Sequence, residues 1–423
     1  IIYPIKNNSS LSKDYAVTLP PNTSSQSVYI QKINPKPIKT ALDADGNVIA
    51  YYTLGPNQGA EVSVDLLSNV KYLNYDLGKS GTPKDIPSSL ITQYTKPTKY
   101  WQSDNAEIQA KAKELTEGKS TVAEQVRAIN DYVIRTLDYN NEKIKYNIRQ
   151  GALKAYQEPA NVVCLEYSDL SIALLRAAKI PARMPVGYGY SGDLKLSPAV
   201  SDSLHSWVEA YIPDVGWINL DPTWGEKFNN FGVSDIDHFT FAIWGADDSK
   251  PAPITENGTD TNYQYEKTTL TYVTEIPKPS NDARLKFTNW VILPFVSLGN
   301  YEIQSPSNSA TFNLELELTQ ASGKRLKSIG STAPAQKATG FLSVLGLGFA
   351  SPGTAKLFEQ NSKDVLASTA ISTNYLPLVL VLALLSVIII VWVVKLLGKK
   401  KTIQLKKEEI QQKDGEKIAV GGS

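Results

Sequence analysis

An apolar run near the end of the chain places the strongest constraint on what this sequence can fold into. Residues 375–395 read YLPLVLVLALLSVIIIVWVVK. They are apolar over about the 20 residues that a helix needs to cross a bilayer. The early Pro377 is tolerated in a first helical turn. A helix that is apolar on every face has no polar side for water, so the sequence predicts a transmembrane helix over residues 375–397.

Basic residues are unevenly distributed around this span. Lys363 is the nearest basic residue before it, whereas six lysines follow within a short stretch: Lys395, Lys399, Lys400, Lys401, Lys406 and Lys407. Cytoplasmic flanks of membrane helices carry an excess of Lys and Arg. We therefore expect the residues before Tyr375 to lie outside the cell and residues 398–423 to form a basic cytoplasmic tail.

Composition limits the remaining classes of protein. A chain of 423 residues is expected to form about two to four domains. Hydrophobic content of 42% and charged content of 20% are typical of folded protein. The net charge of +1 provides no long-range field for nucleic acid, so no nucleic-acid partner is expected. The single cysteine excludes an intramolecular disulfide.

Two β-rich regions are expected on either side of a helical middle. Residues 1–95 contain SVYIQKI and VIAYYTL, which are rich in β-branched and aromatic residues, and LDADGNV, which carries an Asp-Gly turn signal. The helical segment TVAEQVRAINDYVIRTL opens with Thr121 and Glu124 in the spacing of a capping box. From residue 265 to residue 372 the pattern is β again, as in the strictly alternating TFNLELELT.

The only cysteine, Cys164, stands at the expected start of a helix. In NVVCLEYSDL and the residues that follow it, Leu170, Leu174 and Ala178 share one helical face, so the helix should begin close to Cys164. A helix N-terminus carries partial positive charge and free backbone N–H groups, which stabilise a thiolate. The alternative is a small core residue, the commoner role of a lone cysteine.

A histidine and an aspartate follow in the order that acyl transfer requires. His205, one of two histidines in the chain, opens the strand-like LHSWVEAYI, and Asp221 ends the strand-like GWINLD before Pro222. Taken singly, the histidine is expected to be structural and the aspartate to open a turn. Together with Cys164 they suit nucleophilic catalysis, in which a thiolate attacks a carbonyl, an imidazole moves the proton and a carboxylate fixes the imidazole tautomer.

Three segments resemble the motif blocks of the transglutaminase-like superfamily. They are CLEYSDLSIALLRAAKIPARMPVGY, HSWVEAYI and WINLDPTW. The resemblance covers about residues 100–245 and includes LDYN, which ends the second of two preceding helices. It implies a papain-like core in which Cys164 is the nucleophile, His205 the general base and acid, and Asp221 the orienting carboxylate. Val162 stands where the family often has glycine, so the loop that enters the helix is expected to differ.

Other polar and aromatic residues near these blocks are expected to support the site. The backbone N–H of Cys164 is an expected oxyanion donor, and Arg183 is expected to pair with a carboxylate inside the fold. His238, in DIDHFTFAIWG, is expected to be structural. Three tryptophans either wall a groove or pack in the core: Trp207, Trp217 and Trp224. One cysteine and two histidines without ligand spacing make a poor zinc site, and no phosphate-binding glycine motif is present, so no metal or cofactor is expected.

The expected fold class is α+β, with a papain-like transglutaminase core between two β-sandwich-like domains and one C-terminal transmembrane helix. The expected boundaries are 1–95 for the N-terminal β domain, 96–248 for the catalytic domain, 249–264 for a linker, 265–372 for the C-terminal β domain, 375–397 for the transmembrane helix and 398–423 for the tail.

The resemblance and the span together predict a membrane-anchored, extracytoplasmic thiol enzyme. It would act on amide bonds of proteins or peptides, with cell-wall peptides among the candidates, and would contact the lipid bilayer through residues 375–397. Hydrolysis and acyl transfer differ only in whether water or an amine attacks the thioester, and the sequence leaves both open. The alternative function is a non-catalytic surface scaffold or binding module that uses the same fold.

Overall fold

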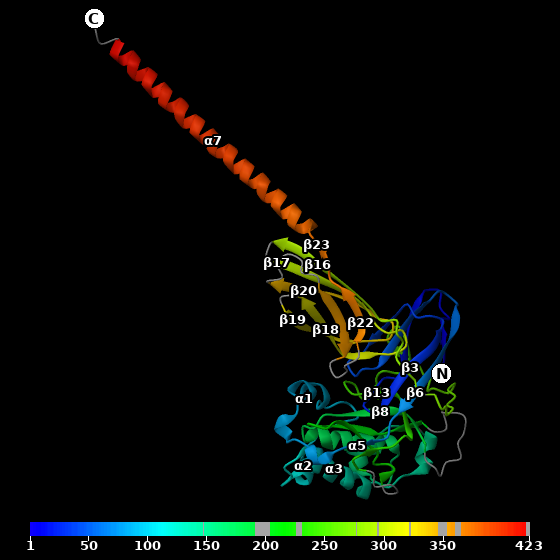
Figure 1. Cartoon of the computed structure of the whole chain (residues 1–423). Helices are drawn as coiled ribbons and strands as arrows, with labels where there is room; N and C mark the ends of the chain where they lie inside the picture. Colours follow the sequence, from blue (N-terminus) through cyan, green and yellow to red (C-terminus); the bar gives the residue numbers. More distant parts are fainter. Residues whose placement is uncertain are drawn as a thin grey trace. The chain divides into compact units, whose positions relative to one another are not determined.

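The structure is a computed structural model of the whole chain (Figure 1). It describes residues 1–146, 148–190, 204–225, 231–275, 277–293, 296–320, 323–345, 353–359 and 365–419. The chain divides into two compact units. The first comprises Ile1–Ala283, Ser305–Leu314 and Gly330–Gln336, and the second comprises Arg284–Gln304, Glu315–Ile329 and Lys337–Ser423.

The first unit begins with β structure, as the sequence predicts. Its first strands are β1 (Ile2–Lys6), β2 (Lys13–Leu19), β3 (Gln26–Asn34), β4 (Lys39–Leu42), β5 (Val48–Leu54), β6 (Gly59–Val70) and β7 (Leu73–Asn74). They form a sheet of order β1-β6-β3 and most of a sheet of order β15-β14-β2-β5-β4. Alternate residues of these strands, such as Tyr15, Val17 and Leu19, are buried in the core between them.

The expected linker at residues 249–264 is built into the second of these sheets. It carries β14 (Ile254–Glu256) and β15 (Thr259–Asp260), and Ile254 lies opposite Val17 of β2. Strand pairing of this kind joins segments that are far apart in the sequence. The local Pro, Asn and Gly content of residues 249–264 therefore cannot predict it.

Helices follow the N-terminal strands. They are the 3₁₀ helices η1 (Leu77–Lys79), η2 (Pro83–Asp85) and η3 (Asn141–Tyr146), and the α-helices α1 (Ser88–Tyr94), α2 (Ala106–Thr116), α3 (Val122–Thr136), α4 (Ala152–Gln157) and α5 (Cys164–Ala177). The predicted capping box is confirmed, because the Thr121 hydroxyl accepts from the Glu124 N–H and the Glu124 carboxylate accepts from the Thr121 N–H.

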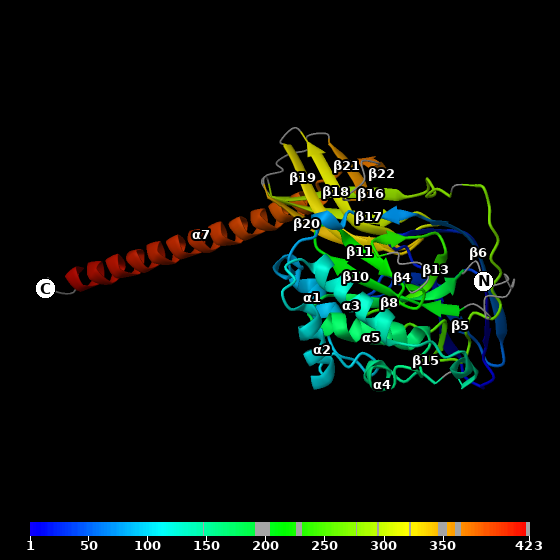
Figure 2. The same cartoon turned by 90° about the horizontal axis from the view of Figure 1, so that it is seen from below.

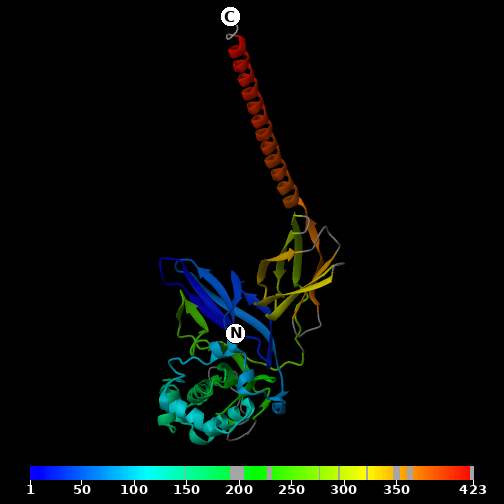
Figure 3. The ribbon, with the colours of Figure 1, turned by 90° about the vertical axis from the view of Figure 1, so that its left-hand side faces the viewer.

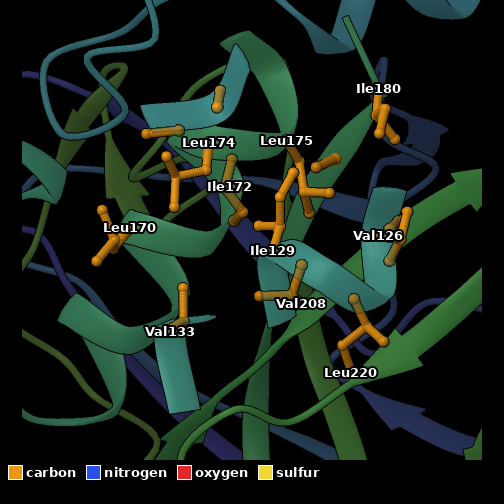
Figure 4. Packing of buried hydrophobic residues seen from close by; sticks show 14 of the residues in the cluster. Val126, Ile129, Val133, Leu170, Ile172, Leu174, Leu175, Ile180, Val208 and Leu220 are labelled. Atoms are coloured by element: carbon orange, nitrogen blue, oxygen red, sulfur yellow. The ribbon is translucent and has the colours of Figure 1, made fainter. Parts of the chain in front are cut away.

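A central sheet packs against these helices. Its strands are β8 (Ala182–Gly189), β9 (Leu204–Ser206), β10 (Val208–Ile212), β11 (Gly216–Leu220) and β13 (His238–Trp244), in the order β11-β10-β8-β13 with β9 also on β8, while β12 (Val233–Ser234) pairs with β7. Figure 2 shows α3 and α5 alongside this sheet, and α5 contacts β8, β9 and β10. The side chains between them are apolar and buried, including Ile129, Leu170, Leu174 and Val208 (Figure 4).

The second unit contains two four-stranded sheets and the C-terminal helix. The strands that lie wholly or mostly in it are β16 (Arg284–Leu293), β17 (Val296–Gln304), β18 (Thr311–Gln320), β19 (Gly323–Thr332), β20 (Lys337–Leu345), β21 (Thr354–Glu359), β22 (Val365–Ala370) and β23 (Ser372–Asn374). The start of β18, as far as Leu314, and the end of β19, from Gly330, are counted in the first unit. The sheet orders are β20-β17-β16-β23 and β19-β18-β21-β22. Leu314, Leu316 and Leu318 of β18 are buried, as the alternation in this segment predicts.

One long helix, α7 (Leu376–Ala419), ends the chain (Figure 3). It is long and apolar enough to cross a membrane, and its apolar side chains are mostly exposed. The α+β class and the apolar C-terminal helix are therefore confirmed. The helix also continues through most of the expected tail, because Lys, Glu and Gln, which follow the apolar run, are good helix formers. Residues 420–423 of that tail lie outside the described residues.

Candidate active site

Cys164 is the first residue of α5, and a buried carboxylate fixes the start of this helix. Glu166 is fully buried. Its Oε2 accepts the backbone N–H of Val163 at 3.0 Å, and its Oε1 accepts that of Gln150 at 2.9 Å. The Nζ of Lys143 lies 2.8 Å from the same Oε1. Glu166 thus ties the residue before Cys164 to the preceding loop.

The helix start gives the sulfur a favourable electrostatic environment. The N–H groups in the first turn of a helix have no intrahelical acceptor, and they carry the positive end of the helix dipole. The side chain of Cys164 is partly exposed at this end. A thiolate there is stabilised by the helix and remains open to a substrate.

His205 reaches the sulfur from β9. Backbone pairing places His205 opposite Gly187 of β8. A Cβ atom at Gly189 would lie 2.9 Å from Cδ2 of His205 and 2.9 Å from Cη2 of Trp224. The absence of a side chain at Gly189 therefore allows the imidazole and the indole to lie close to β8.

Asp221 lies behind the imidazole, as the sequence predicts for an orienting carboxylate. Nε2 of His205 is 2.9 Å from Oδ2 of Asp221. Oδ1 of Asp221 accepts the backbone N–H groups of Thr223 at 3.0 Å and Trp224 at 3.3 Å. Burial raises the pKa of Asp221, but the two histidines that face it outweigh burial and hold the pKa well below its usual range. Burial lowers the pKa of His205, and the Asp221 carboxylate raises it more, to about 10.

The thiol is the third member of this set. Because Nε2 of His205 faces Asp221, Nδ1 is the ring nitrogen that remains to exchange a proton with Cys164. The polar groups of Ser206, the residue after His205, also favour the thiolate. Loss of hydration beside the surrounding protein atoms raises the pKa of the Cys164 thiol. Interactions with His205 and Ser206 lower this pKa by more, so the net shift is downward. The structure brings together Cys164, His205 and Asp221.

His238, expected to be a structural residue, lies against the same carboxylate. Its Nε2 is 3.2 Å from Oδ2 of Asp221, and its Nδ1 is 2.6 Å from Oδ1 of Asp237. Its ring centroid is 5.6 Å from that of His205. The sequence offers one signal for a role of His238 at the site: it is the only other histidine in the chain, and it directly follows an aspartate. That signal is too common to single out a site.

A cavity of about 600 Å³ opens beside the sulfur. Cys164, His205 and Trp224 line it together with aromatic and proline side chains: Tyr139, Phe241, Trp244, Pro251, Pro253 and Tyr265. Burial, and next the nearby Cys164 sulfur, raise the pKa of Tyr139, so its hydroxyl stays protonated. The cavity therefore has room for a peptide side chain. The Tyr139 hydroxyl provides a neutral O–H donor in the same cavity as the nucleophile.

The three tryptophans near the motifs have different environments. Trp224 lines the cavity, whereas Trp207 is buried. Trp217 packs on the guanidinium of Arg183, with 4.2 Å from Cζ to the ring centroid. Nη2 of Arg183 lies 2.6 Å from Oε2 of Glu209. The prediction that Arg183 pairs with a carboxylate inside the fold is confirmed.

A metal ion would compete with this arrangement. Ligand atoms of His205, Asp221 and His238 lie within 4.8 Å of one another, close enough to hold a cation. Both imidazoles, however, already direct Nε2 at Asp221. A cation would replace the hydrogen bond that orients His205, so this donor set fits proton transfer better than metal coordination.

The sequence is similar to a known family and to two curated proteins. Residues 109–222 match the model of the Transglutaminase-like superfamily. An uncharacterized protein YebA of Bacillus subtilis (strain 168) is 29% identical over an alignment of 147 residues, with 31% of this chain and 20% of that protein covered. A protein-glutamine gamma-glutamyltransferase of Pseudomonas aeruginosa is 33% identical over an alignment of 98 residues, with 20% of this chain and 14% of that enzyme covered. The matches thus span a fifth or less of these relatives.

Two solved structures are similar to part of this chain. A candidate cysteine protease from Cytophaga hutchinsonii has a TM-score of 0.44 and 22% identity, with 64% of this chain and 92% of that chain covered. The periplasmic domain of TgpA from Pseudomonas aeruginosa has a TM-score of 0.32 and 18% identity, with coverage of 54% and 75%. The family match and the mixed helix-and-sheet core agree with the resemblance seen in the motifs. The family comparison therefore identifies a transglutaminase-like domain match at residues 109–222 of this chain.

Proposed function

We propose that this protein is a membrane-anchored thiol enzyme that acts on amide bonds of proteins or peptides outside the cytoplasm. One observation carries the proposal: Cys164 at the start of α5 and His205 line the same cavity and interact electrostatically, and Nε2 of His205 lies 2.9 Å from Asp221. That chain of contacts is the arrangement a nucleophile, a proton carrier and an orienting carboxylate require. The proposed catalytic domain is residues 96–248, between β domains at 1–95 and 265–372.

The first half-reaction forms a thioester. The Cys164 thiolate attacks the amide carbon, a C–S bond forms, and the carbonyl electron pair moves to oxygen. As the tetrahedral species collapses, the C–N bond breaks and the His205 imidazolium gives its proton to the leaving nitrogen. An amine, or ammonia from a glutamine side chain, departs and the acyl group stays on sulfur.

The second half-reaction returns the thiolate. Water or a primary amine attacks the thioester carbon, and the neutral imidazole of His205 accepts the proton from that nucleophile. The C–S bond breaks, and the thiolate and imidazolium are restored. Water gives a carboxylate, and an amine gives a new amide. Hydrolysis is our leading proposal, with amine transfer second.

Two donors are proposed for the oxyanion. The backbone N–H of Cys164 lies in the first turn of α5, where helical acceptors are missing. Tyr139 lines the same cavity, and the sulfur contributes to the raised pKa of its hydroxyl. A protonated phenol at this position can donate a hydrogen bond to charge that develops on the carbonyl oxygen.

The proposed location rests on α7 and its charges. The apolar part of α7 is followed by Lys395, Lys399, Lys400 and Lys401, which favours a cytoplasmic C-terminus. The catalytic domain would then lie on the outer side of the membrane, where cell-wall peptides and surface proteins are candidate substrates.

The function is tested with the full-length protein and a library of glutamine-containing peptides, with and without a primary amine. Mass spectrometry should detect loss of ammonia, peptide cleavage or an amine adduct, and Cys164→Ala should give none of these products. If the wild-type protein leaves the whole library unchanged although Cys164 is reactive, a scaffold or a narrower substrate class replaces the proposal.

A further inference from the structure

We propose that His238 and Asp237 form a second histidine–aspartate pair, which holds Asp221 in place and shares its negative charge. This inference rests on the proposed catalytic roles of Cys164, His205 and Asp221. In this account His238 and Asp237 are positioning residues, because they act on the reaction through the carboxylate of Asp221.

The first argument is the geometry around Asp221. Both imidazoles converge on one oxygen, with Nε2 of His205 at 2.9 Å and Nε2 of His238 at 3.2 Å from Oδ2. The other oxygen accepts the backbone N–H groups of Thr223 and Trp224. Four donors from three parts of the chain therefore fix the carboxylate.

The second argument is the number of protons that His238 must carry. Its two ring nitrogens face carboxylate oxygens, at 3.2 Å from Asp221 and 2.6 Å from Asp237. A neutral imidazole has only one N–H, so one nitrogen lone pair would face a carboxylate lone pair. An imidazolium donates to both. Burial lowers the pKa of His238, but the two carboxylates outweigh burial and raise it.

The third argument is the packing around His238. The ring centroids of Trp207 and Trp224 lie 4.6 Å and 4.9 Å from that of His238. Aromatic rings at this distance restrict the imidazole and favour a cation. The titratable groups that face His238 are Asp221 after β11, Asp237 before β13 and His205 on β9. Asp235 lines a small cavity of about 60 Å³ beside them.

A cation at His238 affects both reacting groups. Its ring lies 5.6 Å from the ring of His205. A positive charge there stabilises the Cys164 thiolate and opposes the proton on His205. If the charge is removed, the pKa values of the Cys164 thiol and of His205 should both rise. The pH window in which thiolate and imidazolium coexist should then move to higher pH by about 1 unit.

The test measures the rate of iodoacetamide alkylation against pH in the full-length protein. Cys164 is the only thiol, so the label reports this residue alone. His238→Gln keeps an N–H donor and removes the charge, and Asp237→Asn removes the anion that supports the charge. Both variants should shift the thiol pKa upward, by about 1 unit for His238→Gln. The matched control is Asp235→Asn, since Asp235 is exposed and lines the same cavity without bonding to His238. It should leave the profile unchanged.

Thermal unfolding of each variant separates a structural role from a positioning role. If His238→Gln and Asp237→Asn melt at lower temperature but keep the wild-type alkylation profile, the second pair is only structural and the inference is wrong. If the wild-type thiol itself titrates at the ordinary pKa of cysteine, the proposed function fails as well. The two failures are therefore distinguishable in one data set.

Discussion

The indole of Trp224 lies flat on the imidazole of His205, with ring centroids 4.6 Å apart and an interplanar angle of 9°. The backbone N–H of Trp224 also donates to Oδ1 of Asp221 at 3.3 Å. One residue thus contacts two members of the proposed triad. Stacking on an aromatic face favours an imidazolium and shields one face of the ring from water.

Replacing this indole should weaken catalysis more than folding. We expect Trp224→Ala to reduce turnover about tenfold or more, because His205 loses a stacking partner worth about 1–2 kcal/mol. Trp224→Phe should recover most of that loss. Trp290, which is 37% exposed on β16 of the second unit, provides a control in which Trp290→Ala leaves turnover unchanged. Equal losses in Trp224→Ala and Trp290→Ala would argue against stacking as the cause.

The proposed triad should behave as a unit. Cys164→Ala and His205→Ala should each remove nearly all turnover, and the double variant should lose little more, since both act in one proton-transfer step. Asp221→Asn should have a similar or milder effect. The free energy of unfolding of Cys164→Ala should stay within about 1–2 kcal/mol of wild type, because only a small group is removed. Additive losses in the double variant would contradict a shared step.

Glu166 should control the position of the nucleophile. Its carboxylate is fully buried, pairs with Lys143 and accepts the Val163 N–H. Glu166→Ala leaves a buried cation without its partner and should cost about 3–5 kcal/mol of unfolding free energy. In the matched control, Glu158→Ala removes an exposed i,i+4 pair with Lys154 and should cost less than about 0.5 kcal/mol. Chemical denaturation of both variants provides the comparison.

Tyr139→Phe separates oxyanion stabilisation from thiol activation. Alkylation by iodoacetamide forms no oxyanion, so its rate should stay near wild type. Amide turnover should fall about 10- to 100-fold, because one hydrogen-bond donor to the tetrahedral species is lost. A parallel fall in alkylation and turnover would show instead that Tyr139 acts on the thiol.

The orientation of the chain is tested by protease treatment of intact cells. A soluble fragment that contains residues 96–248 should be released, and an epitope after Lys407 should stay protected. Digestion of that epitope with protection of the fragment would reverse the proposed topology.

Local patterns in the sequence were sufficient for the helix start at Cys164 and for the capping box at Thr121, since both depend on residues within one or two turns. The order of Cys, His and Asp in the chain made His205 and Asp221 candidates, and the family resemblance supplied their expected roles. Their side chains meet in the structure. His238 was missed because its place next to Asp221 depends on the pairing of β13 with β8.

Long-range pairing also explains the other differences. Residues 249–264 have the composition of a linker, yet β14 completes a sheet with β2. The expected Asp-Gly turn is confirmed at Asp45, but its carboxylate is also buried and accepts the backbone N–H groups of Gly245 and Ala246, about 200 residues later in the chain. Periodicity and turn signals describe neighbours in sequence and carry no information on such contacts.

The most direct test of the central claim is the rate of Cys164 alkylation against pH in wild type and in His205→Ala. In wild type, the thiol pKa is lowered and the His205 pKa is raised to about 10, so the thiolate–imidazolium pair should form below the ordinary thiol pKa and persist until His205 loses its proton near pH 10. In His205→Ala, the cation is absent and the rise in rate should move to higher pH. A wild-type midpoint near the ordinary cysteine value of about 8.5, unchanged by His205→Ala, would contradict the account, because the two side chains would then not act together.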